Sequence, residues 1–554
     1  MISLVNQPSQ KEQFQKTFRE KNPKTIEIRG KSFFYDENSM MLWQMDKSLL
    51  EQLNKDSLCM AEAPYWDAFG EIKFKGYLVF QATYACNLAC NYCFVKHHYI
   101  DHENSISLQT CIDAVKAYQA NYLKNGVHVG WFGGEPTMNW ETIYQFTEWV
   151  KKESKNNPDC FKKSSFHITT NATLITEEMA EYFAANNFSF IISLDGNEEE
   201  HNNARPYANA NANNSWKDTM RGLEFVANAF KKAGKQNPIT LRSTFDKNGC
   251  DLVARLKFLN KLMYDGKAGH VSIEPSCLAE SCARNSFEGL TEAEIIAKFQ
   301  EQYFKAADWF LAEVKAGRKP SFHHFTMPLQ RIYEREPAPT ECGAGKGYLS
   351  IGPKGKVSAC HREHESVIGN MYEGIDKTRQ AAWFDNRYFN RIGCNDCWMR
   401  NFCGGGCRCN SALLYKNLQQ PSSIECIFKE MQTKAVIWLM SEMSEKERKQ
   451  YSKQNYRFGI MPGHEAESMK PCSDPNNCEP CKCKLQERNQ KNEEKTEPKK
   501  TQGQPQSQVE KSGEKQAPIC GLKACEGDNC PFAHCGKQTP EDFQAGLKKI
   551  NERG

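Results

Sequence analysis

Between residues 75 and 280, short apolar runs alternate with longer stretches in which apolar positions recur every three or four residues. The short runs predict strands at residues 76–83, 127–132, 165–170, 188–194, 239–245 and 270–274. The longer stretches predict helices, for example at residues 108–123, 141–154 and 177–185. Strands that alternate with helices indicate a parallel sheet wrapped by helices. We therefore predict an α/β fold, a partial (β/α)6 barrel whose chemistry gathers at the carboxyl ends of its strands.

The pattern changes on both sides of this region. Residues 24–53 are typical of short strands followed by a helix at 48–53, which predicts a small N-terminal α+β module. After Pro328 come short segments rich in Cys and Gly, and then an amphipathic helix near 425–444. Residues 484–516 are mostly Lys, Glu, Gln and Pro, a composition typical of disorder. We expect an N-terminal module at 1–70, the barrel at 71–326, a Cys-rich domain at 327–450 and a largely disordered Cys-rich tail at 451–554.

Composition narrows the class of protein. The chain has 554 residues, 25 cysteines and a formal net charge of only +4, so it lacks the basic excess of a nucleic-acid-binding protein. Its first residues are polar, and no run of about 18 apolar residues predicts a membrane span. We expect a cytoplasmic protein, in which clustered thiols are more often metal ligands than disulfides.

Three cysteines follow the first predicted strand at a spacing that favours an iron–sulfur cluster. Cys86, Cys90 and Cys93 lie on one loop and can bind three irons of a 4Fe–4S cube. The fourth iron then has no protein ligand, so a small molecule with an amine and a carboxylate can chelate it. The alternative is a zinc site, closed by His97 or His98.

These residues and those after the next strands resemble the radical S-adenosylmethionine (SAM) superfamily. The resemblance rests on the cysteine motif with its aromatic Tyr92, and on Gly133-Gly134-Glu135-Pro136, Thr169-Thr170-Asn171, Ser193-Leu194-Asp195-Gly196 and Arg205-Pro206. It implies that Gly133, Gly134 and Glu135 contact the SAM amino group and that Tyr92, Ser193 and Arg205 are further cofactor-binding residues. It further implies that the reduced cluster cleaves SAM to a 5′-deoxyadenosyl radical, which abstracts a hydrogen atom from the substrate.

A second group of seven cysteines resembles the SPASM extension of peptide-modifying radical SAM enzymes. Its members are Cys342, Cys360, Cys394, Cys397, Cys403, Cys407 and Cys426. The resemblance implies two auxiliary 4Fe–4S clusters, and hence three clusters in all. One would be bound by Cys394, Cys397, Cys403 and Cys426, and the other by Cys342, Cys360 and Cys407. The fourth ligand of the latter cluster is either Cys409 or a substrate thiolate. The alternative to the two clusters is one or two zinc sites.

Further segments, such as Cys342-Gly343-Ala344-Gly345 and Asn395-Asp396-Cys397-Trp398, look like those of maturases that form thioethers in cysteine-rich "six cysteines in forty-five residues" peptides. The resemblance implies a ribosomally made, Cys-rich precursor peptide or protein as substrate and a flavodoxin- or ferredoxin-type electron donor. The N-terminal module would recognise the precursor, whose leader peptide would add a strand to an exposed sheet edge of the module.

Two other functions remain open. Anaerobic sulfatase maturation, which makes formylglycine, typically uses an Asp directly after the cysteine that matches Cys360. Here His361 occupies that position, and as a group that titrates near neutral pH it is our candidate catalytic residue. A protein of a different class, a non-catalytic electron carrier or scaffold, would release no 5′-deoxyadenosine. The cysteines of the tail, at 472–483 and 520–535, predict an accessory metal site, a partner-docking segment or a tethered substrate-like segment.

Overall fold

The computed structural model describes residues 3–4, 24–36, 41–45, 77–95, 105–119, 126–161, 163–209, 211–212, 214–276, 278, 287, 289–334, 336–338, 340–345, 347–384, 388–395, 397–453 and 455. The chain divides after Pro471 into two units, and all of the second, Cys472–Gly554, lies outside the described residues. The predicted helix at 48–53 and the cysteine groups of the tail lie outside them too.

Six successive parallel strands in the described part of the chain confirm the predicted α/β fold. They are β5 (Tyr77–Thr83), β6 (His128–Gly133), β7 (Ser165–Thr170), β8 (Phe188–Ser193), β9 (Ile239–Phe245) and β10 (His270–Pro275). Each pairs in parallel with the next one along the chain. Every residue of β5 is buried, because a parallel strand that is covered on both faces is buried along its whole length.

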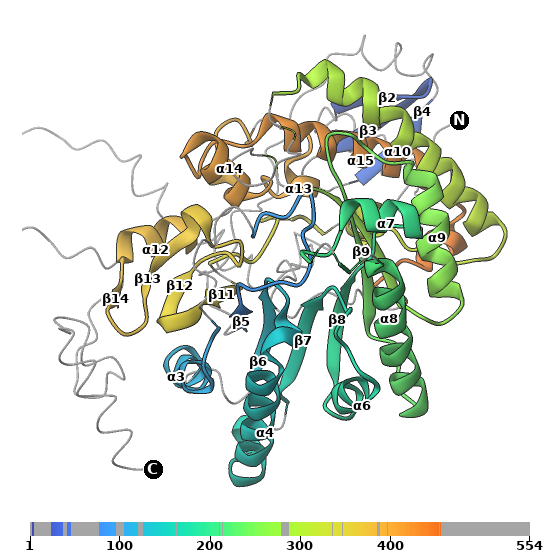
Figure 1. The fold of residues 1–554 in the computed structure, drawn as a ribbon. Coiled ribbons are helices and arrows are strands. Elements are labelled where there is room, and N and C mark those ends of the chain that lie inside the picture. Colours follow the sequence, from blue (N-terminus) through green and yellow to red (C-terminus); the bar gives the residue numbers. More distant parts are fainter. Residues whose placement is uncertain are drawn as a thin grey trace, which may run out of the picture. The chain divides into compact units, whose positions relative to one another are not determined.

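Helices run along the outer side of these strands, as α4, α6 and α8 show in Figure 1. The helices between β5 and β10 in the described residues are α3 (Leu108–Tyr118), η2 (Pro136–Asn139), α4 (Trp140–Asn156), α5 (Pro158–Phe161), α6 (Glu177–Ala185), α7 (Glu198–Ala204), α8 (Ser215–Lys232) and α9 (Leu252–Tyr264). In α8 the buried positions Leu223, Val226 and Phe230 recur every three or four residues and so form one apolar stripe. The helix predicted at 108–123 ends at Tyr118, and residues 120–125 lie outside the described set.

The sheet continues beyond the barrel, which the sequence pattern does not predict. Strand β11 (Tyr348–Ile351) pairs in parallel with β5, and β12 (Lys356–Ser358), β13 (Val367–Asn370) and β14 (Gly374–Ile375) follow as antiparallel neighbours. The result is one sheet of ten described strands. Because β11 lies beside β5, the segment that carries Cys360 lies next to the strand that leads into the first cysteine loop.

The remaining helices belong to the C-terminal half of the described chain. They are α10 (Glu292–Lys315), α11 (His323–Glu334), η3 (Pro353–Gly355), η4 (His364–Ser366), α12 (Lys377–Phe384), η5 (Tyr388–Asn390), α13 (Arg400–Cys403), α14 (Arg408–Tyr415), α15 (Ser423–Glu442) and α16 (Glu445–Lys449). Helix α15 matches the helix predicted near 425–444 and packs against α10 and α11. The expected boundary at 326/327 falls inside α11, which continues through Pro328. No helix in the described residues combines the length and apolar character that a membrane span requires.

The N-terminal region contributes a separate antiparallel sheet with the strand order β1-β4-β3-β2. Its strands are β1 (Ser3–Leu4), β2 (Lys24–Ile28), β3 (Lys31–Asp36) and β4 (Met41–Met45). Strands β2 and β3 join through Arg29 and Gly30, whose φ angles of 49° and 76° suit a two-residue hairpin turn. Arg29 donates to both carboxylate oxygens of Asp308 on α10, at 2.7 and 2.9 Å, and the ring of Tyr35 lies 4.6 Å from that of Phe402.

Candidate functional site

The loop after β5 carries Cys86, Cys90 and Cys93, all partly exposed. Main-chain hydrogen bonds fasten this loop to the segment after α7; for example, Ala89 N donates to Pro206 O at 2.6 Å. Burial raises the pKa of the Cys86 thiol, and the nearby Cys90 and Cys93 raise it further. Such a thiol stays neutral until a metal cation displaces its proton.

Gly133 and Gly134, at the end of β6, lie directly against the cysteine loop. Gly134 N donates to Thr83 O at 2.8 Å, and a Cβ on Gly134 would overlap the carbonyl oxygen of Ala85. Any larger residue would push these two loops apart. The glycines are therefore required by the contact between the β6 turn and the cysteine loop.

Glu135 is almost fully buried, and its carboxylate accepts several hydrogen bonds from the protein. The hydroxyls of Thr137 and Thr170 donate to Oε1 at 2.6 and 2.7 Å, and Asn171 N donates to Oε2 at 2.7 Å. Burial raises the pKa of Glu135, and these donors offset part of that rise. Glu135 thus links the ends of β6 and β7, and its contact with a SAM ammonium stays a prediction.

Asp195, just after β8, holds Tyr92 and Arg205 in place. Arg205 Nε and Nη2 donate to the two carboxylate oxygens of Asp195 at 2.9 and 3.2 Å, and the Tyr92 hydroxyl donates to Oδ2. Burial acts to raise the pKa of Asp195, but the charges of Arg205 and Arg255 outweigh it and lower the pKa to about 2. The motif that contains Asp195 is visible in the sequence, but this ion pair is not.

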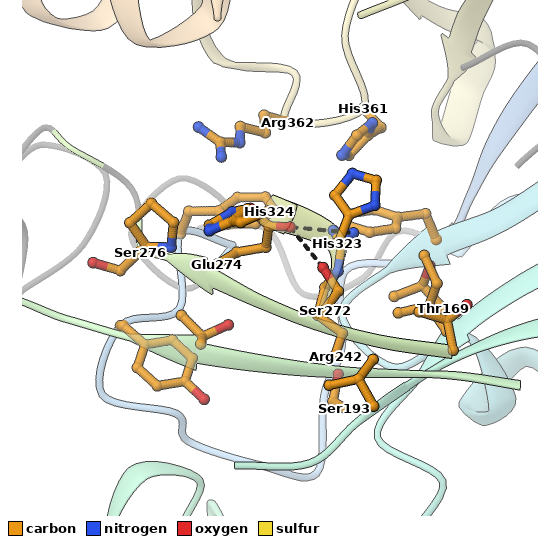
Figure 2. Close-up of a pocket in the computed structure, with 18 of the residues that line it drawn as sticks. Thr169, Ser193, Arg242, Ser272, Glu274, Ser276, His323, His324, His361 and Arg362 are labelled. Carbon is orange, nitrogen blue, oxygen red and sulfur yellow. Dashed lines mark hydrogen bonds and ion pairs between the residues drawn. The ribbon is translucent and has the colours of Figure 1, made fainter. Parts of the chain in front are cut away.

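A cavity of about 400 Å³ extends from the first cysteine loop to the C-terminal cysteine region. Its wall contains all the residues predicted to bind the first cluster and SAM: Cys86, Cys90, Cys93, Tyr92, Gly133, Gly134, Glu135, Ser193 and Arg205. The C-terminal region contributes His361, Arg362 and Cys403 to the same wall. Figure 2 shows Ser193 and Thr169 across the cavity from His361 and Arg362. This volume lies within the range of roughly 300–1,000 Å³ that is usual for ligand sites.

Strand β10 and helix α11 add a polar pair to this cavity that the sequence analysis missed. Glu274 Oε2 lies 2.8 Å from His324 Nε2, and Ser272 Oγ donates to Glu274 Oε1 at 2.6 Å (Figure 2). Burial acts to raise the pKa of Glu274, but His324 and Arg242 reverse that effect and hold the pKa well below its usual value. Its position at the carboxyl end of a predicted strand could have identified Glu274 as a candidate site residue from the sequence.

Behind this pair, further hydrogen bonds position the imidazole of His324. Gln432 Nε2 donates to the Tyr303 hydroxyl at 3.2 Å, and that hydroxyl lies 3.0 Å from His324 Nδ1. Both ring nitrogens of His324 are thus engaged, Nδ1 with Tyr303 and Nε2 with Glu274.

His361, the candidate catalytic residue, lines the same cavity. Its Nδ1 lies 2.9 Å from the Tyr348 hydroxyl, and its ring stands edge-on to Phe132 at 4.5 Å. Gln81 Nε2 donates to its carbonyl oxygen at 2.6 Å. These contacts with β5, β6 and β11 fix the ring in position, and its role in proton transfer stays a prediction.

The structure brings Cys342, Cys360 and Cys407 together and adds Cys409 to them. Gly345 N donates at 2.8 Å to the carbonyl oxygen that precedes Cys360, which places the segment after Cys342 beside it. Cys407 precedes the first residue of α14 and makes no side-chain capping hydrogen bond, and Cys409 is buried in the first turn of that helix. A hydrogen bond with Cys409 lowers the pKa of Cys360 to about 6 and raises that of Cys409.

Cys394, Cys397, Cys403 and Cys426 form a second set. Cys426 interacts electrostatically with Cys394 and Cys397, and Cys403 interacts with Cys426. Although Cys426 is exposed, desolvation and the neighbouring Glu425, Cys394 and Cys397 raise the pKa of its thiol. Within the described residues, no three His, Cys, Asp or Glu side chains are close enough to share one metal ion. A four-iron cube instead binds each thiolate at a different iron, so its ligands lie farther apart.

These residues fit iron–sulfur clusters and SAM. Each cysteine set presents only thiols, the usual ligands of such clusters. At the first set, the two glycines bring main chain directly against the cysteine loop, where a cluster-bound ligand would lie. The adjoining cavity contains both cationic and anionic side chains, as a ligand with ammonium and carboxylate groups requires.

The comparisons with known proteins agree with this site. Residues 80–247 match the model of the Radical SAM superfamily. The radical SAM cyclopropyl synthase TigE of Paramaledivibacter caminithermalis is 26% identical over 58% of this chain and 65% of its own length. The cysteine-type anaerobic sulfatase-maturating enzyme of Clostridium novyi is 31% identical over 28% of this chain and 40% of its own. The mycofactocin maturase MftC of Mycolicibacterium smegmatis is 26% identical over 60% of this chain and 77% of its own length. The chain thus spans less than two thirds of the first two of these relatives.

Solved structures share the fold. Native anSMEcpe with bound AdoMet superposes with a TM-score of 0.51 at 19% identity, covering 66% of this chain and 98% of that one. The same protein with bound AdoMet and Kp18Cys peptide gives a TM-score of 0.51 at 20% identity, covering 66% and 98%. At such identities the likeness establishes the fold alone. Residues 80–247 of this chain thus contain a domain that matches the Radical SAM superfamily.

Proposed function

We propose that this protein is a radical SAM maturase that forms thioether cross-links from Cys residues of a ribosomally made, Cys-rich precursor peptide. The observation that carries the proposal is the single cavity with the first cysteine loop on one side and His361, Arg362 and Cys403 on the other. A peptide residue in this cavity would be within reach of both regions. The relatives' names, a cyclopropyl synthase and two kinds of maturase, support a modifying enzyme.

We further propose that the protein binds three 4Fe–4S clusters, one at each cysteine set. We infer that Cys86, Cys90 and Cys93 bind the first cluster together with SAM. Cys394, Cys397, Cys403 and Cys426 would bind one auxiliary cluster, and Cys342, Cys360 and Cys407 would be ligands of the other. When bound, these groups supply hydrogen-atom abstraction from the substrate and acceptance of the electron that the product leaves behind.

The chain's own residues would position SAM. The main chain at Gly133 and Gly134 can approach the ligand closely. Ser193 offers a hydroxyl, and the guanidinium of Arg205 offers the donors that Asp195 does not use. The ring of Tyr92 lies against Arg205, 5.3 Å from the guanidinium carbon, and restricts its movement.

The protein must also accept a proton. Joining a thiol sulfur to a carbon of another residue removes one hydrogen atom from that carbon, and one proton and one electron from the thiol. His361 and the Glu274–His324 pair both line the cavity and can take up the proton. An electron donor of the flavodoxin or ferredoxin class would supply the electron that starts each turnover.

The N-terminal sheet would recognise the precursor. Strand β2 is the last strand in the order β1-β4-β3-β2, so a leader peptide could add a strand beside it. Main-chain hydrogen bonds would provide the affinity, and the sheet is connected to α10 through the Arg29–Asp308 ion pair.

Anaerobic sulfatase maturation is the second candidate, favoured by the 31% identical relative. Oxidation of a Cys to formylglycine also needs a proton acceptor near the substrate. His361 replaces the Asp expected in such enzymes after the cysteine that matches Cys360. The carboxylate of Glu274, which reaches the cavity from β10, could serve in its place.

Anaerobic reconstitution followed by turnover tests the proposal. The holoenzyme is incubated with SAM, dithionite and either a Cys-rich precursor peptide or a peptide with a sulfatase Cys site. Loss of two hydrogens and one free thiol in the Cys-rich peptide supports thioether formation, whereas an aldehyde in the other peptide supports the second candidate. Cys86→Ala is the control and should release no 5′-deoxyadenosine. No release from the unsubstituted enzyme would favour a non-catalytic scaffold, and release without change in either peptide would refute both candidates.

A further inference from the structure

Eight cysteines of the C-terminal region divide into two groups of four. Cys394, Cys397, Cys403 and Cys426 make one group, as described above. The other contains Cys342, Cys360, Cys407 and also Cys409, which lies outside the seven-cysteine motif. Four thiols complete the ligand set of a cube, whereas three leave one iron open.

Contacts made by the neighbours of Cys409 determine its position. It lies two residues after Cys407, in the first turn of α14. Arg362 Nη1 donates to Oδ1 of Asn410, the residue next to Cys409, at 2.7 Å. Because Arg362 follows Cys360 by two residues, this bond draws the Cys360 segment onto the start of α14. The Tyr348 hydroxyl holds Cys360 from its other side, 3.7 Å from Sγ.

The surroundings of Cys409 suit a metal ligand. Its side chain is 2% exposed and that of Cys360 is 5% exposed, so neither thiol is freely accessible to a second macromolecule. The guanidinium of Arg362 interacts electrostatically with Cys407, Cys409 and Cys360. A partly buried cation beside several thiols offsets the negative charge that they acquire when a cluster takes their protons.

We propose that Cys409 is the fourth thiolate ligand of the auxiliary cluster held by Cys342, Cys360 and Cys407. This inference rests on the proposed cluster content of the protein. Binding replaces the S–H bond of Cys409 with an S–Fe bond and releases one proton, without oxidation or reduction. The cluster then has no open iron, so a substrate thiol reaches the cavity without binding to iron and the cluster exchanges only electrons.

The test measures whether this cluster accepts a thiol from solution. The full chain with Cys86, Cys90 and Cys93 replaced by Ala is reconstituted anaerobically, which leaves the two auxiliary clusters, roughly eight irons per chain. Electron paramagnetic resonance spectra of the reduced protein are compared with and without N-acetylcysteine. The same measurement is made after adding Cys409→Ala, Cys409→Ser or Cys111→Ala. Cys111 is the matched control because it is a fully buried free thiol in α3.

If Cys409 is a ligand, N-acetylcysteine leaves the parent and Cys111→Ala spectra unchanged and alters that of Cys409→Ala. Mild oxidation should then convert one cluster of Cys409→Ala to a 3Fe–4S form. A parent spectrum that responds to the thiol overturns the proposal, as does a Cys409→Ala spectrum equal to that of Cys111→Ala. If the circular dichroism spectrum shows that Cys409→Ala is unfolded, the paramagnetic resonance spectra of the parent and of Cys409→Ser test the proposal instead. Because no peptide is present, failure of the proposed function would not change any of these outcomes.

Discussion

Replacement of Asp195 by Asn tests whether a buried ion pair holds the predicted SAM-binding residues in place. The Asp195 side chain is 0% exposed and that of Arg205 is 8% exposed. The substitution keeps the size of the side chain, removes its charge and leaves Arg205 buried without a counter-ion. It also weakens the hydrogen bond from Tyr92.

The cost follows from the pKa of Asp195, which falls from 3.8 to about 2 in the folded protein. At about 1.36 kcal/mol per pKa unit, this depression corresponds to roughly 2 kcal/mol. Removal of one partner from a buried pair typically costs about 3–5 kcal/mol, so we expect a loss of about 2–5 kcal/mol in the free energy of unfolding. A carboxyl group whose pKa is lower in the folded than in the unfolded protein stabilises the fold at pH values above the unfolded-state pKa. The advantage of the wild type should therefore be constant near neutral pH and disappear as the pH falls from about 4 towards 2.

Urea unfolding followed by tryptophan fluorescence measures this loss. The matched control is Glu181→Gln, in an ion pair with Lys232 whose side chains are 49% and 76% exposed, and it should unfold at the wild-type urea concentration. The affinity of the reconstituted protein for S-adenosylhomocysteine, measured by calorimetry, should fall in Asp195→Asn and stay unchanged in Glu181→Gln. Unfolding of Asp195→Asn at the same urea concentration as Glu181→Gln would refute the reasoning.

Three further substitutions test other parts of the site. Gly134→Ala places a methyl group against the Ala85 carbonyl, so we expect loss of the first cluster, seen as about four fewer irons per chain. Glu274→Gln removes the charge beside His324 and should lower product formation by about a hundredfold or more while 5′-deoxyadenosine is still released; loss of both in equal measure would indicate a role in SAM binding instead. His361→Asp restores the residue expected for sulfatase maturation, so formylglycine from a sulfatase-type peptide should increase, and no increase would argue against that function.

Local patterns predicted the parallel sheet well. Strands β7 and β9 have the predicted bounds, and β5, β6, β8 and β10 differ from the prediction by one residue at one or both ends. This accuracy has a local cause, because apolar runs and helical repeats reflect burial of the element that contains them. The first cysteine loop and the glycine turn were also predictable, since each follows a strand and parallel strands end at the same edge.

Contacts between distant segments were not predictable. Glu274 and His324 are 50 residues apart in the chain and meet only because α11 packs beside β10. The pairing of β11 with β5, which brings Cys360 towards the first cysteine loop, likewise has no signal in either strand alone.

The amino-acid sequence by itself determined the α/β class, the order of the barrel strands and the cysteine motifs, because periodicity and spacing are properties of short segments. The tertiary structure decided that Arg205 is paired with Asp195, that Cys409 lies with Cys360, and that one cavity is lined by the first cysteine loop together with Cys403. These features arise when segments far apart in the chain pack against each other. Which partners meet then depends on the whole folded core and on the cost of burying unpaired polar groups.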